Sequence, residues 1–186
     1  GMLLNRKKSL FSQGLGLFGV SLFGVFFAAI IVFSLGLLWQ GRTSQMVVQT
    51  AALLSFCMVV YHSAWAMGEE EGRLSRLEKR PVRSHRGVPV GLVAAVPYFA
   101  AGLILILSKA GAIPDVAFLY KLFTPQHVFF INWVMPSGYA ANASWGAVAL
   151  VIGFHLCLPV TAWLGSLLGT REILLLYRLV FRSPKR

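Results

Sequence analysis

The residues best equipped for chemistry within this apolar chain centre on a single histidine. His155 lies about ten residues, or about 15 Å along a helix, into a charge-free stretch, and Cys157 follows it closely. Pro159 stands four residues after His155, where a proline removes the helical hydrogen bond to the histidine carbonyl. Polar groups beside broken helices in the middle of a membrane are typical of transport sites. In two other apolar stretches, the residues Pro97, Tyr98 and Cys57 lie at about the same expected depth in the membrane as His155.

These six residues also have a simpler interpretation, which we prefer. A buried histidine can hydrogen-bond to Ser, Thr or a carbonyl of a neighbouring helix, and prolines are tolerated in membrane helices for packing alone. His155, Cys57 and Cys157 have the ligand types of a soft-metal site, but a metal would need the second and fourth helices to be neighbours and one further ligand. We therefore predict no metal site and no cofactor.

The sequence contains no recognisable catalytic set. None of the four long apolar stretches holds a carboxylate, so a paired-aspartate protease or a carboxylate-driven ion carrier has no centre there. The zinc motif His-Glu-x-x-His, the P-loop and Gly-x-Ser-x-Gly are all missing. Residues 14–19 spell G-x-G-x-x-G, but they enter a membrane helix instead of following a strand. We predict no catalytic residues.

The composition specifies the elements that must position these side chains. Of the 186 residues, 57% are hydrophobic and only 12% are charged, whereas a soluble domain carries about 25% charged residues. Four charge-free stretches are long enough to cross the hydrocarbon core as helices: 14–39, 46–67, 88–108 and 145–168. The sequence therefore predicts one all-α membrane domain over 1–186, built as a bundle of four helices.

The distribution of charge predicts the orientation of this bundle. The net charge is +11, and fourteen Lys and Arg residues lie in the N-terminal segment, the loop 68–87 and the tail. The other side carries only three, Arg42, Lys109 and Lys121. The positive-inside rule then places both termini in the cytoplasm. With so apolar a chain, the basic residues indicate anionic lipid head groups as partners, and no nucleic acid.

The loop 68–87 has two interpretations. It continues as a short helix from the second span, which Pro81 should stop, and it then serves either as a solvated connector or as a docking surface. The docking surface would meet a membrane or cytosolic protein partner, or anionic lipid. Its candidate contacts, with those of the tail, are Glu69, Glu70, Glu71, Arg73, Arg76, Lys79, Arg80, Arg83, Arg86, Arg171, Arg178 and Arg182.

Two further segments carry predictions. The external segment 109–144 is long and aromatic, and we expect two short helices broken near Pro125 that lie at the interface or re-enter the bilayer. Polar residues such as Lys121 and Asn132 argue against a fifth span over 115–135. The tail 170–186 has the pattern of a basic amphipathic helix on the cytoplasmic leaflet.

Small residues recur at a spacing of four in two of the predicted helices. Such spacing lets membrane helices approach closely, and we expect it to serve packing within the bundle before any homodimer. The fourth helix carries Gly165 and Gly169, and the first carries Ser12, Gly16, Val20, Gly24 and Ala28.

One junction resembles a known group of sequences. The run Tyr61-His62-Ser-Ala-Trp65-Ala-Met-Gly68-Glu69, with Arg86, Gly87 and Gly91 at the start of the third helix, is similar to small uncharacterised bacterial multi-span membrane proteins. The resemblance implies a multi-pass protein of a bacterial plasma membrane. The triple-acid run at 69–71 departs from the Asp-Arg-Asn loop of that group, so the resemblance extends to topology and to no mechanism.

Three functional hypotheses remain. The first is a non-catalytic integral membrane protein that acts as an accessory subunit or scaffold through its charged cytoplasmic face. The second is a small transporter or channel component with a midplane site near His155. The third is a lipid-handling membrane enzyme whose basic face holds phosphates, although no nucleophile or acid pair is visible for it.

Overall fold

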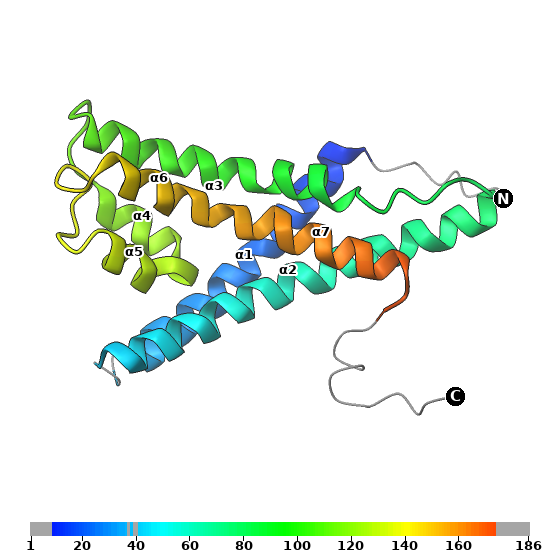
Figure 1. Ribbon diagram of the computed structural model, residues 1–186, viewed down its shortest axis with the longest axis horizontal. Helices are drawn as coiled ribbons and strands as arrows, with labels where there is room; N and C mark the ends of the chain where they lie inside the picture. The colour runs from blue at the N-terminus through cyan, green and yellow to red at the C-terminus, as the bar shows by residue number, and fades with distance from the viewer. Residues whose placement is uncertain (1–8, 37, 39–40, 174–186) are drawn as a thin grey trace.

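The computed structural model describes residues 9–36, 38 and 41–173, and this part of the chain is helical with no strand (Figure 1). Its elements are α1 (Leu10–Leu35), α2 (Arg42–Glu78), α3 (Gly87–Lys109), α4 (Ala117–Phe123), η1 (Pro125–His127), α5 (Val128–Val134), α6 (Trp145–Gly153), η2 (Phe154–Leu156) and α7 (Cys157–Thr170). The prediction of an all-α chain is confirmed for these residues.

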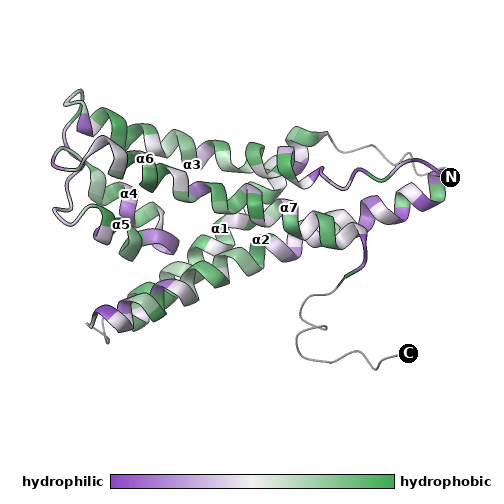
Figure 2. Ribbon diagram, viewed as in Figure 1, coloured by the Kyte–Doolittle hydropathy of each residue, from purple (hydrophilic) through white to green (hydrophobic). Residues whose placement is uncertain are grey.

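Four helical units are long and apolar enough to cross a membrane: α1, α2, α3 and the unit Trp145–Thr170 formed by α6, η2 and α7. Figure 2 shows hydrophobic residues along all four, with hydrophilic residues gathered toward their ends. Large apolar side chains also face outward, as Phe23 and Phe26 of α1 do. The prediction of four membrane-length helices is confirmed, and the chain is consistent with an integral membrane protein.

The four long units form a closed ring in which each helix contacts two others. α1 packs against α2 and α3, and α7 packs against the same two helices from the other side. The enclosed core takes Leu17 from α1, Phe56 from α2, Tyr98 from α3 and Leu158 from α7. Because successive spans run in opposite directions, α2 and α7 are parallel neighbours in this ring (Figure 1).

In the contact between α2 and α7, the backbones of the two helices lie directly against each other. A Cβ atom at Gly169 would lie 2.1 Å from the Trp65 carbonyl oxygen, and one at Gly68 would lie 2.2 Å from the Ser166 carbonyl oxygen. Gly72 and Gly165 stand at the same seam, facing Thr170 and Tyr61. Small residues allow this approach, and dispersion forces then hold the helices together where lipid provides no hydrophobic drive.

The α1 residues that recur at a spacing of four do not all lie on the buried face of the helix. Gly24 and Ala28 are buried, but Ser12 and Gly16 are exposed. A spacing of four advances about 40° per step around a helix of 3.6 residues per turn, so five such positions cannot share one face. The buried positions of α1 instead follow one another by steps of three or four residues: Gly14, Leu17, Ser21, Gly24, Ala28 and Val32.

Helix α2 is longer than a membrane requires. Its 37 residues extend about 55 Å, against a hydrocarbon core of about 30 Å, so the part after Met67 projects beyond the apolar stretch. The helix ends at Glu78, where Lys79 adopts a left-handed conformation with φ 49°, two residues before Pro81. The helical continuation expected for the loop is therefore present, uninterrupted from the span itself.

The segment 109–144 folds as two short helices around a turn. α4 and α5 are separated by η1, which begins at Pro125, so residues 115–135 do not form one continuous helix. A second apolar core beneath them joins Tyr120 and Ile131 to Leu105 of α3 and Val148 of α6. The position of this segment relative to the bilayer stays a prediction.

Two other predicted features lie near the end of the chain. The fourth unit is interrupted at η2, where Pro159 cannot donate a hydrogen bond to the carbonyl of His155. After α7, residues 171–173 form a turn, and the rest of the predicted amphipathic tail, 174–186, lies outside the described residues.

Replacing Gly169 by Ala should lower the free energy of unfolding by about 1–3 kcal/mol, because the new methyl group meets backbone that cannot move without separating α2 from α7. The measurement is unfolding in mixed micelles of increasing denaturing-detergent fraction. Gly16→Ala is the matched control, since nothing lies within 4 Å of a Cβ there. Equal stabilities of the two variants would contradict the proposed close contact.

Candidate functional site

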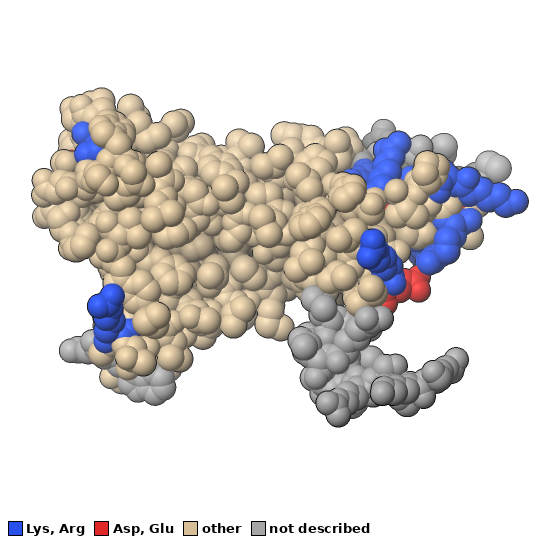
Figure 3. All heavy atoms as spheres, in the orientation of Figure 1, with Lys and Arg blue, Asp and Glu red and all other residues tan. Residues whose placement is uncertain are grey.

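A pocket of about 330 Å³ opens at the end of the bundle where α2 finishes. We call this end, with residues 69–86, the charged end; Figure 3 shows Lys, Arg and acidic residues gathered there, with few charges elsewhere on the same face. The pocket is lined by the first residues of α1 and α3, the last turns of α2, part of α7 and the segment 79–86. It therefore combines residues that are far apart in the sequence.

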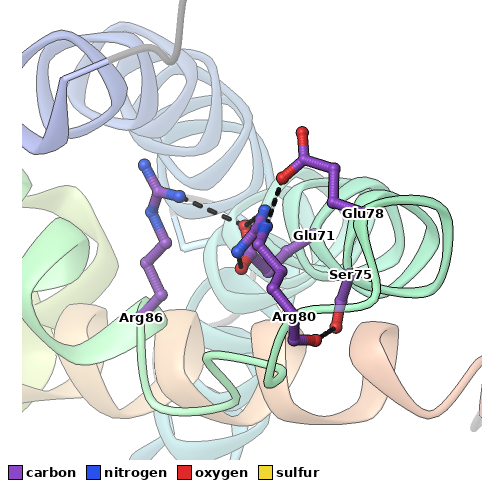
Figure 4. Close-up of polar contacts among 5 residues, drawn as sticks. All are labelled: Glu71, Ser75, Glu78, Arg80 and Arg86. Atoms are coloured by element: carbon purple, nitrogen blue, oxygen red, sulfur yellow. Dashed lines mark hydrogen bonds and ion pairs between the residues drawn. The ribbon is translucent and has the colours of Figure 1, made fainter.

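Glu71 is the centre of the polar contacts at this pocket. It is only 5% exposed, although its neighbours Glu69 and Glu70 are exposed. Arg80 binds both of its carboxylate oxygens, through Nη1 at 2.6 Å and Nη2 at 3.2 Å, and Arg86 Nη1 lies 3.2 Å from Oε2 (Figure 4). A carboxylate shared by two guanidinium groups retains its charge in a low-dielectric position, because each hydrogen bond is charge-assisted.

Arg80 ties the segment after α2 back onto the helix. Its Nε donates to Glu78 Oε2 at 2.6 Å, and its carbonyl oxygen accepts a hydrogen bond from the Ser75 hydroxyl (Figure 4). The hydrogen bonds to Glu71 and Glu78 raise the pKa of the Arg80 guanidinium above its ordinary value. Two of the three arginines in the segment 79–86, Arg80 and Arg86, thus tie it to the end of α2. The choice between a connector and a docking surface stays a prediction.

The remaining lining of the pocket is amphiphilic. Glu70 and Arg83 are exposed and form no ion pair within the described residues, while Gln13 and Ser166 contribute an amide and a hydroxyl. Apolar side chains complete the walls: Leu10, Met67, Leu74 and Val90.

The other predicted contact residues divide by position. Arg76 forms an ion pair with Glu172, which joins the end of α2 to the turn after α7. Arg178 and Arg182 lie outside the described residues. The candidates left exposed at the surface are Glu69, Arg73, Lys79 and Arg171.

The predicted midplane residues are mostly brought together. His155 is buried in η2, and its Nε2 lies 2.5 Å from the Tyr120 hydroxyl oxygen. The Tyr98 ring is 5.3 Å from the His155 ring, centre to centre, and the Tyr98 hydroxyl shares a hydrogen bond of 2.7 Å with Ser21. His155 is thus a buried, hydrogen-bonded histidine, but its partner is a tyrosine of the segment 109–144 and not the Ser, Thr or carbonyl of a neighbouring helix that we expected.

The cysteines and prolines around His155 have separate roles. Cys57 of α2 and Cys157 of α7 both pack against the core shared by the four helices, and both are free cysteines. Pro159 packs against α3, where a Cβ at Gly91 would lie 2.6 Å from its Cα. Pro97 is a half-buried residue inside α3.

His127 is a member of this cluster that the sequence interpretation missed. Its Nε2 lies 3.8 Å from Cys157 Sγ, and its ring centre lies 5.7 Å from that of His155. Its position beside Pro125 in a polar turn was the only available signal. Burial, and secondarily the charge that His155 would carry, lower the pKa of His127 to about 3, so the ring is neutral at pH 7.

Gln49 was also missed, although it is a lone amide in a charge-free apolar stretch. Its Nε2 donates to the Gln126 carbonyl oxygen at 2.5 Å, and its Oε1 accepts from the Phe129 backbone nitrogen at 2.7 Å. One α2 side chain thus holds η1 and the start of α5 against the bundle. The Gln126 side-chain amide and His127 Nδ1 are buried and have no hydrogen-bond partner in the described structure.

Chemically, the buried cluster offers neutral hydrogen-bonding groups, and the pocket offers fixed charges. Within the described residues, no group of three His, Cys, Asp or Glu side chains is arranged to hold a metal ion. Comparison of the chain with protein-family models, with curated proteins and with solved structures gives no match. The buried cluster and the pocket are therefore the two candidate sites of function in the described part of the chain.

Removing the charge of Glu71 should release the segment 79–86. In Glu71→Gln the two arginines lose their shared carboxylate, so the backbone amides of this segment should exchange hydrogen several-fold faster than in the wild type. The measurement is hydrogen exchange in detergent, read by mass spectrometry. Glu70→Gln is the control, since Glu70 is exposed; unchanged exchange in Glu71→Gln would show that the ion pairs do not order the segment.

The depressed pKa of His127 predicts a pH dependence of stability. Between about pH 6.5, the ordinary value, and pH 3, the unfolded chain binds a proton that the folded chain does not, so stability falls as the pH falls through this window. In His127→Gln the slope should be shallower by up to about 1.4 kcal/mol per pH unit. Unfolding in mixed micelles at several pH values measures it, and identical slopes would contradict the assignment.

Proposed function

We propose that this chain is an integral membrane protein that acts as a non-catalytic accessory subunit or scaffold. Its charged end faces the cytoplasm, as the bias of basic residues predicts, and docks a protein partner there. The observation that carries the proposal is the projection of α2 beyond the apolar stretch, with the segment 79–86 tied to it through Glu71. A preordered surface loses little conformational entropy when a partner binds.

The projecting part of α2 also carries an apolar side chain with no apolar surroundings. Leu77 is 75% exposed, beyond the stretch that a bilayer would cover. Its sequence neighbours are Arg76 and Glu78, and the exposed cations Arg73, one helical turn earlier, and Lys79 lie close to it in the chain. Val82 of the next segment is a second exposed apolar residue at this end. Apolar anchors surrounded by charge are the composition of a protein interface. The partner we infer presents an apolar pocket with acidic residues around it.

The structure changes which acidic residues could take part in docking. Glu71 is buried and bonded to two arginines, so it serves the shape of the surface and is not available to a partner. Glu69 and Glu70 are the exposed members of the acidic run.

A second candidate function, a transporter or channel component, has one specific observation in its favour. The side-chain amide of Gln126 and Nδ1 of His127 are buried without a partner in the described structure, and a buried unpaired polar group costs about 1–3 kcal/mol. A polar occupant, either water or a transported solute, would remove this cost. We rank this function second because these atoms alone do not define a path across the bundle.

The docking proposal is tested with two exposed leucines at opposite ends of the molecule. Leu77→Ser should abolish co-purification of a stoichiometric protein partner from native membranes in mild detergent, because it removes the apolar anchor. Leu38→Ser is the matched control, since Leu38 is 74% exposed at the other end of the bundle. Quantitative mass spectrometry of the eluates measures how much of the partner co-purifies with the wild type and with each variant.

The docking proposal fails under two outcomes of this experiment. The wild-type protein could elute without a stoichiometric partner, or the partner could remain with both variants at equal amounts. Either result would favour the second candidate function, at the buried cluster around His127 and His155.

A further inference from the structure

The pocket at the charged end joins an apolar wall to a charged one. Leu10, Met67 and Val90 belong to helices whose apolar surfaces face lipid, whereas Glu70 and Arg83 belong to the segment beyond the apolar stretch. The pocket therefore lies at the level where hydrocarbon gives way to head groups, whichever leaflet this is. A ligand that fits both walls is an amphiphile.

The charges of the lining nearly cancel among themselves. Arg80 is bonded to Glu71 and Glu78, and Arg86 is bonded to Glu71. Among the described residues of the lining, two charged groups are left outside these ion pairs, the cation Arg83 and the anion Glu70, and both are exposed. A ligand complementary to this lining carries one negative and one positive charge, because a purely anionic head group would place its charge beside Glu70 as well as beside Arg83.

We propose that this pocket binds the head group of a zwitterionic phospholipid with a primary ammonium, its phosphate on Arg83 and its ammonium on Glu70. Gln13 and Ser166 contribute an amide and a hydroxyl that can donate to phosphate oxygens, and the acyl chains run along Leu10 and Val90. A volume of about 330 Å³ is at the lower end for ligand sites, about 300–1,000 Å³. The ion pairs of Arg80 and Arg86 fix the segment between them, so Arg83 is held in place before the lipid arrives.

This inference goes beyond docking and can fail separately from it. Leu77 is not one of the residues that line the pocket, so a docking variant leaves the lipid site intact. The lipid site also holds for either orientation of the chain in the membrane.

The test is native mass spectrometry of the detergent-purified full chain with three defined lipids: phosphatidylethanolamine, phosphatidylglycerol and phosphatidylcholine of equal chain length. We expect phosphatidylethanolamine to bind most tightly, because its ammonium can donate hydrogen bonds to Glu70 and the quaternary ammonium of phosphatidylcholine cannot. Equal binding of all three, or tighter binding of phosphatidylglycerol, would overturn the proposal.

Two charge-removing variants separate the two contacts. Arg83→Gln should weaken the binding of phosphatidylethanolamine and phosphatidylglycerol alike by about tenfold, through the lost phosphate contact. Glu70→Gln should weaken only phosphatidylethanolamine and so reverse the preference toward phosphatidylglycerol. Both residues are exposed and outside the ion pairs, so the variants should fold like the wild type, which thermal unfolding in detergent verifies.

Matched controls and a soluble competitor complete the design. Arg73→Gln and Glu69→Gln make the same changes on exposed residues outside the pocket, and they should leave all three affinities unchanged. Soluble phosphoethanolamine should displace the lipid only weakly, since it lacks acyl chains. If the controls weaken binding as much as the pocket variants do, or if phosphoethanolamine binds as tightly as the lipid, the proposed lipid site is wrong.

Discussion

The arrangement of this molecule depends on the direct contact of two parallel helix backbones, α2 and α7. The contact exists because glycines on both helices leave no side chain between them, so that carbonyl oxygens lie where a Cβ would otherwise be. It lets Cys57 of α2 and Cys157 of α7 pack against the same core. Toward the charged end it places the Trp65 indole nitrogen 3.0 Å from the Ile173 carbonyl oxygen, and Arg76 against Glu172. The projection of α2 is thereby supported along its side.

The charged end shows how one run of like residues can hold different roles. Glu69, Glu70 and Glu71 are consecutive, yet only Glu71 is turned into the protein, where two arginines neutralise it. The desolvation of that carboxylate is offset by charge-assisted hydrogen bonds, and the segment 79–86 acquires a fixed course as a consequence. A fixed course is what gives both the docking surface and the pocket a definite shape.

The opposite half of the bundle is organised by neutral hydrogen bonds. Tyr120 reaches from α4 to His155, and Gln49 reaches from α2 to the turn η1. These contacts join the segment 109–144 to the long helices by groups that carry no charge, which a low-dielectric interior tolerates when each group is paired. The unpaired amide of Gln126 and Nδ1 of His127 are exceptions among the described residues, and they mark the place in this half where a polar occupant would be most favourable.

Local composition was enough to predict four apolar helices, the concentration of charge at one end, and the interruption near His155 that Pro159 imposes. Hydropathy over a membrane's thickness and the missing amide of proline act within a few turns of helix. Only the tertiary structure decided that His127 stands beside Cys157, that Gln49 holds η1, and that Glu71 is the buried member of its run. These choices follow from which helices are neighbours and how each is rotated. Helix periodicity shows which residues share a face, but not which residues of a neighbouring helix they contact. Positions at a spacing of four also rotate gradually around the helix.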